Sequence, residues 1–246
     1  MKPSTCADHL AHVIKKLTLT LNAGEIVSIV GPSGCGKSTL LNVISGIIPP
    51  TSGNVRWYGE PLSGVPARTG YMLQKDLLLP WRTVLGNAVL GLEIKGTPKQ
   101  ESEERAYQLL KRLGLAGSEH AYPYRLSGGM RQRAALARTL VTDPQVMLLD
   151  EPFAALDFQS KLLIENDCAA LVREENRSAL LITHDVEEAV SMSDRVLVLS
   201  QRPTEVIRTY EIEIEGNRLD MMEARESANF RETVHSIWDD LQQTRH

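Results

Sequence analysis

The chain has 246 residues, 42% of them hydrophobic and 24% charged, which is enough apolar content to bury a sizeable core as one large domain. The formal charge of -4 gives no basic surface signature, so nucleic acid is not expected as the main partner. Residues 1–5 lack an apolar signal core, and no stretch approaches the run of ~20 apolar residues that spans a bilayer, so we expect another chain to supply any membrane contact.

The first part of the chain predicts two strands. Leucine alternates with polar residues at positions 17–21, which predicts an antiparallel edge strand, and residues 22–24 predict a turn after it. The apolar run at residues 26–30 predicts a buried strand that leads into a group of glycines.

The stretch after this strand matches the phosphate-loop pattern in residue type and in spacing. It consists of Gly31, Pro32, Ser33, Gly34, Cys35, Gly36, Lys37, Ser38 and Thr39. Its glycines let successive backbone N–H groups point at phosphate oxygens, and an amphipathic helix predicted at residues 39–44 adds the positive end of its dipole. Lys37 can then reach the β- and γ-phosphates, and the Ser38 hydroxyl can bind the Mg²⁺ that bridges them. The stretch therefore predicts a nucleotide site.

Short strands follow the loop and its helix. Residues 49–53, rich in Pro, Ser and Gly, predict a break, and strands are predicted at residues 54–58 and 70–74. Gln74 is therefore expected at the end of a strand.

A helical segment comes next, at residues 75–140. Thr83 can cap its first helix, Thr97-Pro98 opens a second helix, and Gly114 ends the second one. The segment predicts a helical lobe inserted between the strands of an α/β core. We expect one domain over residues 1–246, with residues 1–74 and 141–246 forming that core.

After the lobe, strands alternate with helices. Strands are predicted at residues 146–149, 178–183 and 195–199, and Asp185 can cap a helix between the last two. This alternation predicts a largely parallel sheet. Residues 210–215 alternate apolar and acidic side chains, which predicts a half-exposed strand. A last helix has one apolar stripe, expected to pack on the core, formed by Phe230, Val234, Ile237, Trp238 and Leu241.

Two adjacent acids follow the strand at residues 146–149. Asp150 and Glu151 lie at its carboxyl end, where ligands collect in open parallel sheets. Asp150 would point back to the phosphate loop and hold Mg²⁺ through water, whereas Glu151 would reach past the γ-phosphate and orient the attacking water. A solvated pair at a strand end is the alternative, but it leaves an apolar strand that ends in two carboxylates unexplained.

A second anion site is predicted within the helical segment. Ser127 can cap a helix whose free N–H groups and dipole face an anion, and Gly128 and Gly129 follow it. This helix start has no lysine of its own.

The order and spacing of six elements resemble the ATP-binding subunit of an ABC transporter, over nearly the whole chain. They are the phosphate loop, Gln74, residues 126–133, the Asp150-Glu151 pair, residues 155–157 and His184. The resemblance implies a P-loop NTPase core with a mostly parallel sheet, an antiparallel β edge and an inserted helical lobe.

The resemblance also implies a composite site. Ser127, Gly128 and Gly129 would bind the γ-phosphate of a nucleotide held by the phosphate loop of a second copy. A head-to-tail dimer with two ATP molecules in its interface is implied, with Asp157 passing across it and His184 bonding the γ-phosphate and the attacking water.

The implied site residues fall into three sets. The catalytic set is Lys37, Gln74, Glu151 and His184, the Mg²⁺ ligands are Ser38, Gln74 and Asp150, and the ATP-binding set is residues 31–39 with Ser127, Gly128, Gly129 and Asp157.

Two departures from the family pattern stand out. Met130 stands where most of the family has glutamine, and this variant, followed by Arg131-Gln132-Arg133, looks like the importer branch for nitrate, sulfonate, taurine, bicarbonate and pyrimidine precursors. In addition, residues 1–30 contain no Phe, Tyr or Trp to stack on adenine. Either His9 or His12 stacks on the base, or adenine recognition is loose.

Residues 77–83, which include Trp81, also resemble that importer branch. In the family, this region forms a groove that receives a helix of the membrane subunit. An apolar cluster with Trp at the boundary of two lobes suits a docking surface. Simple packing between the lobes is the alternative.

We therefore expect an ATPase that closes as two copies around two MgATP and powers solute import through separate permease subunits, with a solute-binding protein as an indirect partner. Cys6, Cys35 and Cys168 are odd in number and lack metal-like spacing, so reduced thiols and a cytoplasmic place at the inner membrane face are expected.

One alternative is a P-loop ATPase that clamps DNA, but no heptad run matches the coiled-coil insertions of those relatives. The other is a regulatory nucleotide switch, which would hardly need Glu151 and His184 together.

Overall fold

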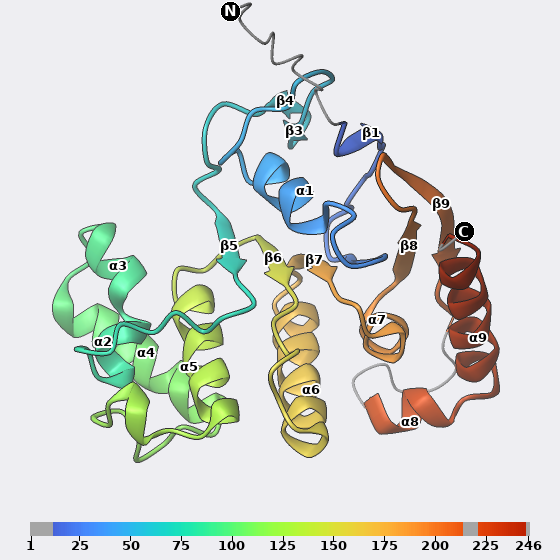
Figure 1. Cartoon of the computed structure of the whole chain (residues 1–246). Helices are drawn as coiled ribbons and strands as arrows, with labels where there is room; N and C mark the ends of the chain where they lie inside the picture. The colour runs from blue at the N-terminus through green and yellow to red at the C-terminus, as the bar shows by residue number, and fades with distance from the viewer. Residues whose placement is uncertain (1–11, 214–220, 245–246) are drawn as a thin grey trace, which may run out of the picture.

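One sheet forms the centre of the molecule in the computed structural model, which describes residues 12–213 and 221–244 (Figure 1). Within these residues the sheet has seven strands, in the order β1 (Ile14–Lys16), β9 (Thr204–Glu211), β8 (Arg195–Leu199), β2 (Ile26–Val30), β7 (Ser178–Ile182), β6 (Val146–Asp150) and β5 (Thr69–Met72). The strands from β8 to β5 run parallel to one another, whereas β9 is antiparallel to β8. The expected α/β fold with a mostly parallel sheet and an antiparallel edge is confirmed.

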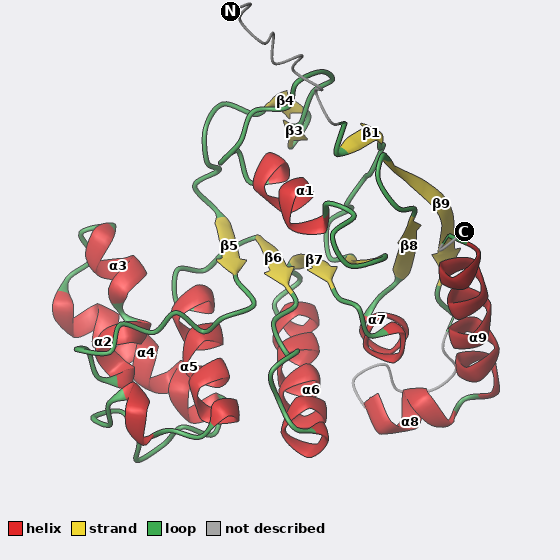
Figure 2. Ribbon diagram, viewed as in Figure 1, coloured by secondary structure: helices red, strands yellow, loops and turns green. Residues whose placement is uncertain are grey.

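The central strands are buried on both faces, as their uninterrupted apolar sequences require. On β6, Met147 and Leu149 belong to one core cluster, whereas Leu148 belongs to a second cluster with Leu41 of α1 (Lys37–Ile44). Helix α1 covers one face of the sheet, and α6 (Phe158–Glu174) and α7 (Val186–Met192) cover the other (Figure 2).

A group of helices lies beside β5 (Figure 1). In chain order they are α2 (Val84–Ala88), α3 (Leu90–Ile94), α4 (Lys99–Arg112), the 3-10 turn Pro123–Arg125 and α5 (Gly128–Leu140). Thr83 caps α2 by accepting a hydrogen bond from the N–H of Gly86, as predicted, and Gly114 follows α4 with a φ of +68°. We call this group of helices the lobe, and all of them fall within residues 75–140. The division of the chain into this lobe and a core stays a prediction.

The remaining elements are a short hairpin and two C-terminal helices. The hairpin β3 (Arg56–Trp57) and β4 (Glu60–Pro61) is separate from the main sheet, and α8 (Met221–Glu226) and α9 (Ala228–Gln243) pack near α7. The stripe on α9 packs on the core as predicted through Phe230, Ile237 and Leu241, whereas Trp238 is 40% exposed.

The prediction of an edge strand at residues 17–21 is wrong. Leu17, Leu19 and Leu21 are half-buried between exposed neighbours and pack on the second cluster, yet these residues form no strand. The strand lies earlier, at β1, and pairs in parallel with β9. The leucine alternation reflects burial against the core, which does not require ladder hydrogen bonds.

Two other strands end at different residues than predicted. β5 ends at Met72, the partner of Leu149 on β6, so Gln74 lies in the loop beyond the strand. β9 ends at Glu211, whose partner Arg195 is the first residue of β8. The predicted alternation at 210–215 therefore continues past the end of β9, and residues 214 and 215 lie outside the described part of the chain.

Candidate nucleotide-binding site

The stretches singled out in the sequence meet at one edge of the sheet. The glycine-rich loop follows β2, Gln74 follows β5, Glu151 follows β6 and His184 follows β7. Because these four strands are parallel, their carboxyl ends share one edge, which the arrowheads of β5, β6 and β7 mark in Figure 1.

Two glycines shape the loop between β2 and α1. Gly34 and Gly36 have φ values of +78° and +116°, which disfavour any residue with a Cβ. A Cβ on Gly36 would also lie 2.7 Å from Cγ1 of Val13, so this position needs glycine for space as well. The loop therefore turns tightly in front of α1 only with these residue types.

Lys37 lies inside the loop. Its Nζ donates hydrogen bonds to the carbonyl oxygens of Gly31 at 2.8 Å and Pro32 at 3.1 Å, and the residue is only 7% exposed. Helix α1 begins at Lys37, and Gly36 before it offers no side-chain cap. A buried ammonium beside free N–H groups of a first helical turn suits a polyanion such as a phosphate chain.

Asp150 lies against the start of α1, at the end of β6. Burial raises the pKa of Asp150 and Glu151 raises it further, although the hydrogen bond from Ser38 and the charge of Lys37 lower it. Burial and the charge of Asp150 together raise the pKa of Tyr71 to about 12. A buried carboxylate in this setting favours an additional positive charge nearby.

Glu151 is held by contacts from two sides. Its φ of +47° lies in the left-handed region, and its backbone N–H donates to the carbonyl of Ile182 at 2.8 Å. Its Oε2 accepts a hydrogen bond from Nε2 of Gln74 at 3.1 Å and lies 3.3 Å from Nδ1 of His184. The structure thus brings three of the predicted residues together at one carboxylate oxygen.

Ser127 and Asp157 are placed differently, at the starts of α5 and α6. Ser127 caps α5 by accepting from the N–H of Met130 at 3.2 Å, and Asp157 caps α6 by accepting from the N–H of Ser160 at 3.0 Å. The latter bond holds the pKa of Asp157 below its usual value. Ser127, Gly128 and Asp157 are exposed, and α5 lies in the lobe, on the opposite side of the sheet from α1 (Figure 1).

Gln132 is a residue near the site that the sequence reasoning missed. Its Nε2 donates a hydrogen bond to the carbonyl of Pro152, directly after the acid pair. Gln132 is buried although it stands between two arginines in the sequence. A buried polar side chain needs such a partner, but its burial is not visible in the local sequence.

Exposed aromatic and apolar side chains gather on the lobe, and we call Leu77, Trp81, Tyr122 and Tyr124 the lobe surface. Trp81 is 70% exposed, and the rings of Tyr122 and Tyr124 stack with centroids 5.8 Å apart. Hydrogen bonds from the N–H groups of residues 84 and 85 to the carbonyls of residues 121 and 119 hold the two segments side by side.

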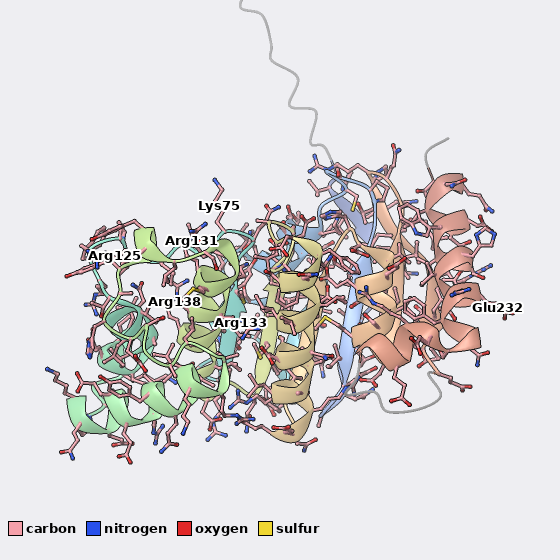
Figure 3. The ribbon with its side chains drawn as sticks, turned by 90° about the horizontal axis from the view of Figure 1, so that it is seen from below. Lys75, Arg125, Arg131, Arg133, Arg138 and Glu232 are labelled. Carbon is pink, nitrogen blue, oxygen red and sulfur yellow. The ribbon has the colours of Figure 1, made fainter. Side chains whose placement is uncertain are left out.

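Basic side chains flank the lobe surface. Figure 3 shows Lys75 projecting from the site edge, with Arg131 close to it and Arg125 further out on the lobe. The guanidinium of Arg125 lies 5.8 Å from the ring centroid of Tyr124, and Arg131 pairs with Asp76 at 3.1 Å. Arg125 thus places a positive charge beside this aromatic surface. Among the described residues, no helix combines the length and the apolar character that crossing a membrane requires.

Comparisons with known proteins show the family of this chain. A family model described as ABC transporter matches residues 14–154. An uncharacterized ABC transporter ATP-binding protein of Methanocaldococcus jannaschii, MJ0412, is 45% identical over 83% of this chain and 77% of its own length. The taurine import ATP-binding protein TauB of Escherichia coli O157:H7 is 44% identical over 79% of this chain and 76% of its own length.

A solved structure is similar as well. The ATP-binding cassette MJ0796, in a dimeric post-hydrolysis state bound to ADP and Pi, superposes with a TM-score of 0.73 and 32% identity, covering 82% of this chain and 91% of that one. Residues 14–154, which the family model matches, include the phosphate loop and the Asp150-Glu151 pair. The chain belongs to the ABC transporter family, as an ATP-binding protein that hydrolyses ATP.

Proposed function

We propose that two copies of this chain close around two MgATP and that hydrolysis powers solute import through separate membrane subunits. The observation that carries the proposal is the meeting of Gln74 and His184 at one oxygen of Glu151, beside a loop suited to phosphate. A carboxylate held in this way suits the activation of water, which a plain nucleotide switch does not need.

The residues at the sheet edge fit MgATP. Within the described residues, no group of three or more His, Cys, Asp and Glu side chains could hold a metal ion alone. Mg²⁺ is commonly bound by one or two carboxylates together with phosphate oxygens and waters, and Ser38, Gln74 and Asp150 offer oxygen ligands of that kind. When bound, Mg²⁺ supplies positive charge to the phosphate oxygens.

Four of these side chains have proposed roles in the hydrolysis step. Lys37 moves its ammonium from the loop carbonyls to the phosphate oxygens, where it balances negative charge. Glu151 orients the attacking water and accepts its proton. His184 bonds the γ-phosphate and that water, and Gln74 holds the carboxylate of Glu151 in place.

The second copy is proposed because Ser127 begins a helix that has no lysine beside it. Its free N–H groups, with Gly128 and Gly129, would bind the γ-phosphate on the loop of the partner copy. Asp157, exposed at the start of α6, would cross the interface. The dimeric structures of the similar cassette MJ0796 support this arrangement.

The lobe surface is the proposed docking site for the permease. Its exposed aromatic residues suit the apolar face of a helix from a membrane subunit. The likeness to TauB supports the taurine and sulfonate branch of importers, with a solute-binding protein as an indirect partner. The buried free thiols of Cys35 and Cys168 suit a cytoplasmic position on the inner face of the membrane.

The DNA-clamping alternative finds no support in the lobe. In the described residues between the phosphate loop and Ser127, the longest helix is α4, with 14 residues, and no pair of long helices forms a coiled coil there. Nucleic acid is therefore not proposed as a partner.

Affinity purification of the tagged chain from detergent-solubilised membranes tests the proposal. We expect integral membrane subunits to copurify with the native chain and to be lost with Trp81→Ala, whose ATPase activity in isolation stays unchanged. The matched control is Tyr107→Ala, which removes a partly exposed aromatic residue outside the lobe surface. Equal recovery of the same membrane subunits with Trp81→Ala would contradict the docking site.

A further inference from the structure

A buried ionic cluster joins the starts of α6 and α7, outside the phosphate loop. Nζ of Lys161, on α6, lies 2.7 Å from Oδ2 of Asp185 and 2.7 Å from Oε2 of Glu188. It also lies 3.6 Å from Oε1 of Glu165. The Lys161 side chain is 15% exposed, and Glu165 and Glu188 are buried. One ammonium is thus shared by carboxylates from two helices.

Two residues of the cluster, Lys161 and Asp185, lie close to residues of the proposed site. The N–H of Lys161 donates to the carbonyl of Asp157 at 2.9 Å, in the first turn of α6. Asp185 follows His184 directly in the chain. The Lys161 side chain therefore joins the first turn of α6, which Asp157 begins, to the residue that follows His184.

The two oxygens of Asp185 have separate roles. Oδ1 caps α7 by accepting from the N–H groups of Glu187 at 2.9 Å and Glu188 at 3.2 Å. Oδ2 accepts from Lys161. The cap stabilises α7 by itself, whereas the contact of Oδ2 with Lys161 ties the start of α7 to α6, alongside the contact of the same ammonium with Glu188.

Stability alone explains the cluster poorly. Burial raises the pKa of Glu165 and of Glu188 to about 7 each, and the second cation is Arg225 of α8, 3.2 Å from Oε2 of Glu165. Apolar side chains of similar size often stabilise a fold as well as a buried ion pair does. A hydrogen-bonded ion pair differs from apolar contacts because it requires a defined geometry, so it holds two helices in one relative position.

We propose that Lys161 is a positioning residue for ATP hydrolysis, which binds Asp185 and so fixes His184 relative to Glu151 and Asp157. This inference rests on the role of His184 in the proposed function. Without the contact, Asp185 still caps α7 but is no longer tied to α6, so the 3.3 Å approach of its neighbour His184 to Glu151 is no longer enforced.

Asp185→Asn tests the contact directly, because the amide keeps an oxygen for the cap and presents an NH₂ group where Lys161 needs an acceptor. With the purified full chain, we expect kcat for ATP to fall about tenfold while KM changes less than about twofold. Lys161→Met should give the same result. Lys161→Arg should restore most of kcat, since a guanidinium can bind the same acids. Wild-type kcat in Asp185→Asn would overturn the inference.

Two further variants separate positioning from charge burial. Lys161→Met combined with Glu188→Gln removes one charge of each sign from the cluster but leaves the tie to Asp185 broken. A kcat that stays low supports positioning, whereas recovery to the wild-type kcat overturns it.

The role of His184 itself is tested by a double-mutant comparison. In a His184→Ala background, Asp185→Asn should lower single-turnover hydrolysis no further, because both changes act through the same imidazole. A second, independent loss would overturn the inference. If His184→Ala alone leaves hydrolysis unchanged, the proposed function of His184 is wrong. Slow His184→Ala together with normal Asp185→Asn overturns only the role of Lys161.

Discussion

The Nδ1 atom of His184 lies 3.3 Å from Oε2 of Glu151, although 32 residues lie between them in the chain. Glu151 follows β6 and His184 follows the neighbouring strand β7. The same oxygen accepts a hydrogen bond from Gln74, beyond β5. Parallel pairing of these three strands brings the three side chains to one edge. A general base needs one defined position, and these contacts provide it.

Replacement of the base should trap the nucleotide. Glu151→Gln should slow ATP turnover by at least about a hundredfold while ATP stays bound, because an amide cannot accept the proton of water as a carboxylate does. With ATP, the variant should run as a dimer in size-exclusion chromatography. Glu104→Gln, at an exposed position on α4, is the control. A Glu151→Gln variant that stays monomeric with ATP at high concentration would contradict the composite site.

Loss of the loop lysine should abolish tight binding of MgATP. Lys37→Ala removes the ammonium that lies 2.8 Å from the Gly31 carbonyl inside the loop. We expect at least about a hundredfold weaker binding in calorimetry, since charge-assisted contacts to phosphate are among the strongest polar contacts. Lys99→Ala, at an exposed lysine, should bind normally. Wild-type affinity of Lys37→Ala would show that this loop does not hold the phosphates.

A methyl group at Gly36 should disturb the loop more than one at Gly34. The Gly36 position has a φ of +116° and would place Cβ 2.7 Å from Val13, whereas a Cβ on Gly34 meets nothing within 4 Å. Gly36→Ala should therefore weaken ATP binding by about tenfold more than Gly34→Ala does. Nucleotide titrations of the two variants measure the difference, and equal affinities would rule out the role of this contact.

The buried Glu188 should make stability depend on pH. Burial raises its pKa from 4.5 to about 7, so the protonated form favours folding, and this contribution is full below pH 4.5 and lost as pH rises to about 7. Glu188→Gln does not titrate. Its free energy of unfolding, measured by denaturant titration, should therefore gain roughly 3 kcal/mol relative to wild type between pH 4.5 and pH 8. A difference independent of pH would contradict the shifted pKa.

Adenine and guanine should be distinguished poorly. No aromatic residue precedes the phosphate loop, His12 is exposed, and His9 lies outside the described residues. Base stacking on an aromatic ring contributes about 1 to 3 kcal/mol, so phosphate contacts should dominate and KM should be similar for ATP and GTP. His9→Tyr or His12→Tyr should tighten ATP binding at the position that faces the base. Strong ATP preference, unchanged by His9→Ala and His12→Ala, would show that the base is recognised elsewhere.

Local signals made several features predictable from the sequence. The buried strand at residues 26–30, the glycines of the loop and the caps at Thr83, Ser127 and Asp185 all appear where the sequence predicts them. Each depends on residues within a few positions along the chain: an apolar run, a left-handed turn, or a side-chain oxygen close to the N–H groups that it binds.

The sequence by itself determined the buried central strands, the loop and the residue types available for chemistry, whereas the tertiary structure decided which of them meet. Leucine alternation at residues 17–21 encodes burial but names no partner strand, so the edge strand was misplaced. The hydrogen bond from Gln132 joins α5 to the turn after β6, and the contact between Lys161 and Asp185 joins α6 to the start of α7. Such contacts depend on how parallel strands order the helices around a sheet, because electrostatics and packing act over distance in space, regardless of separation along the chain.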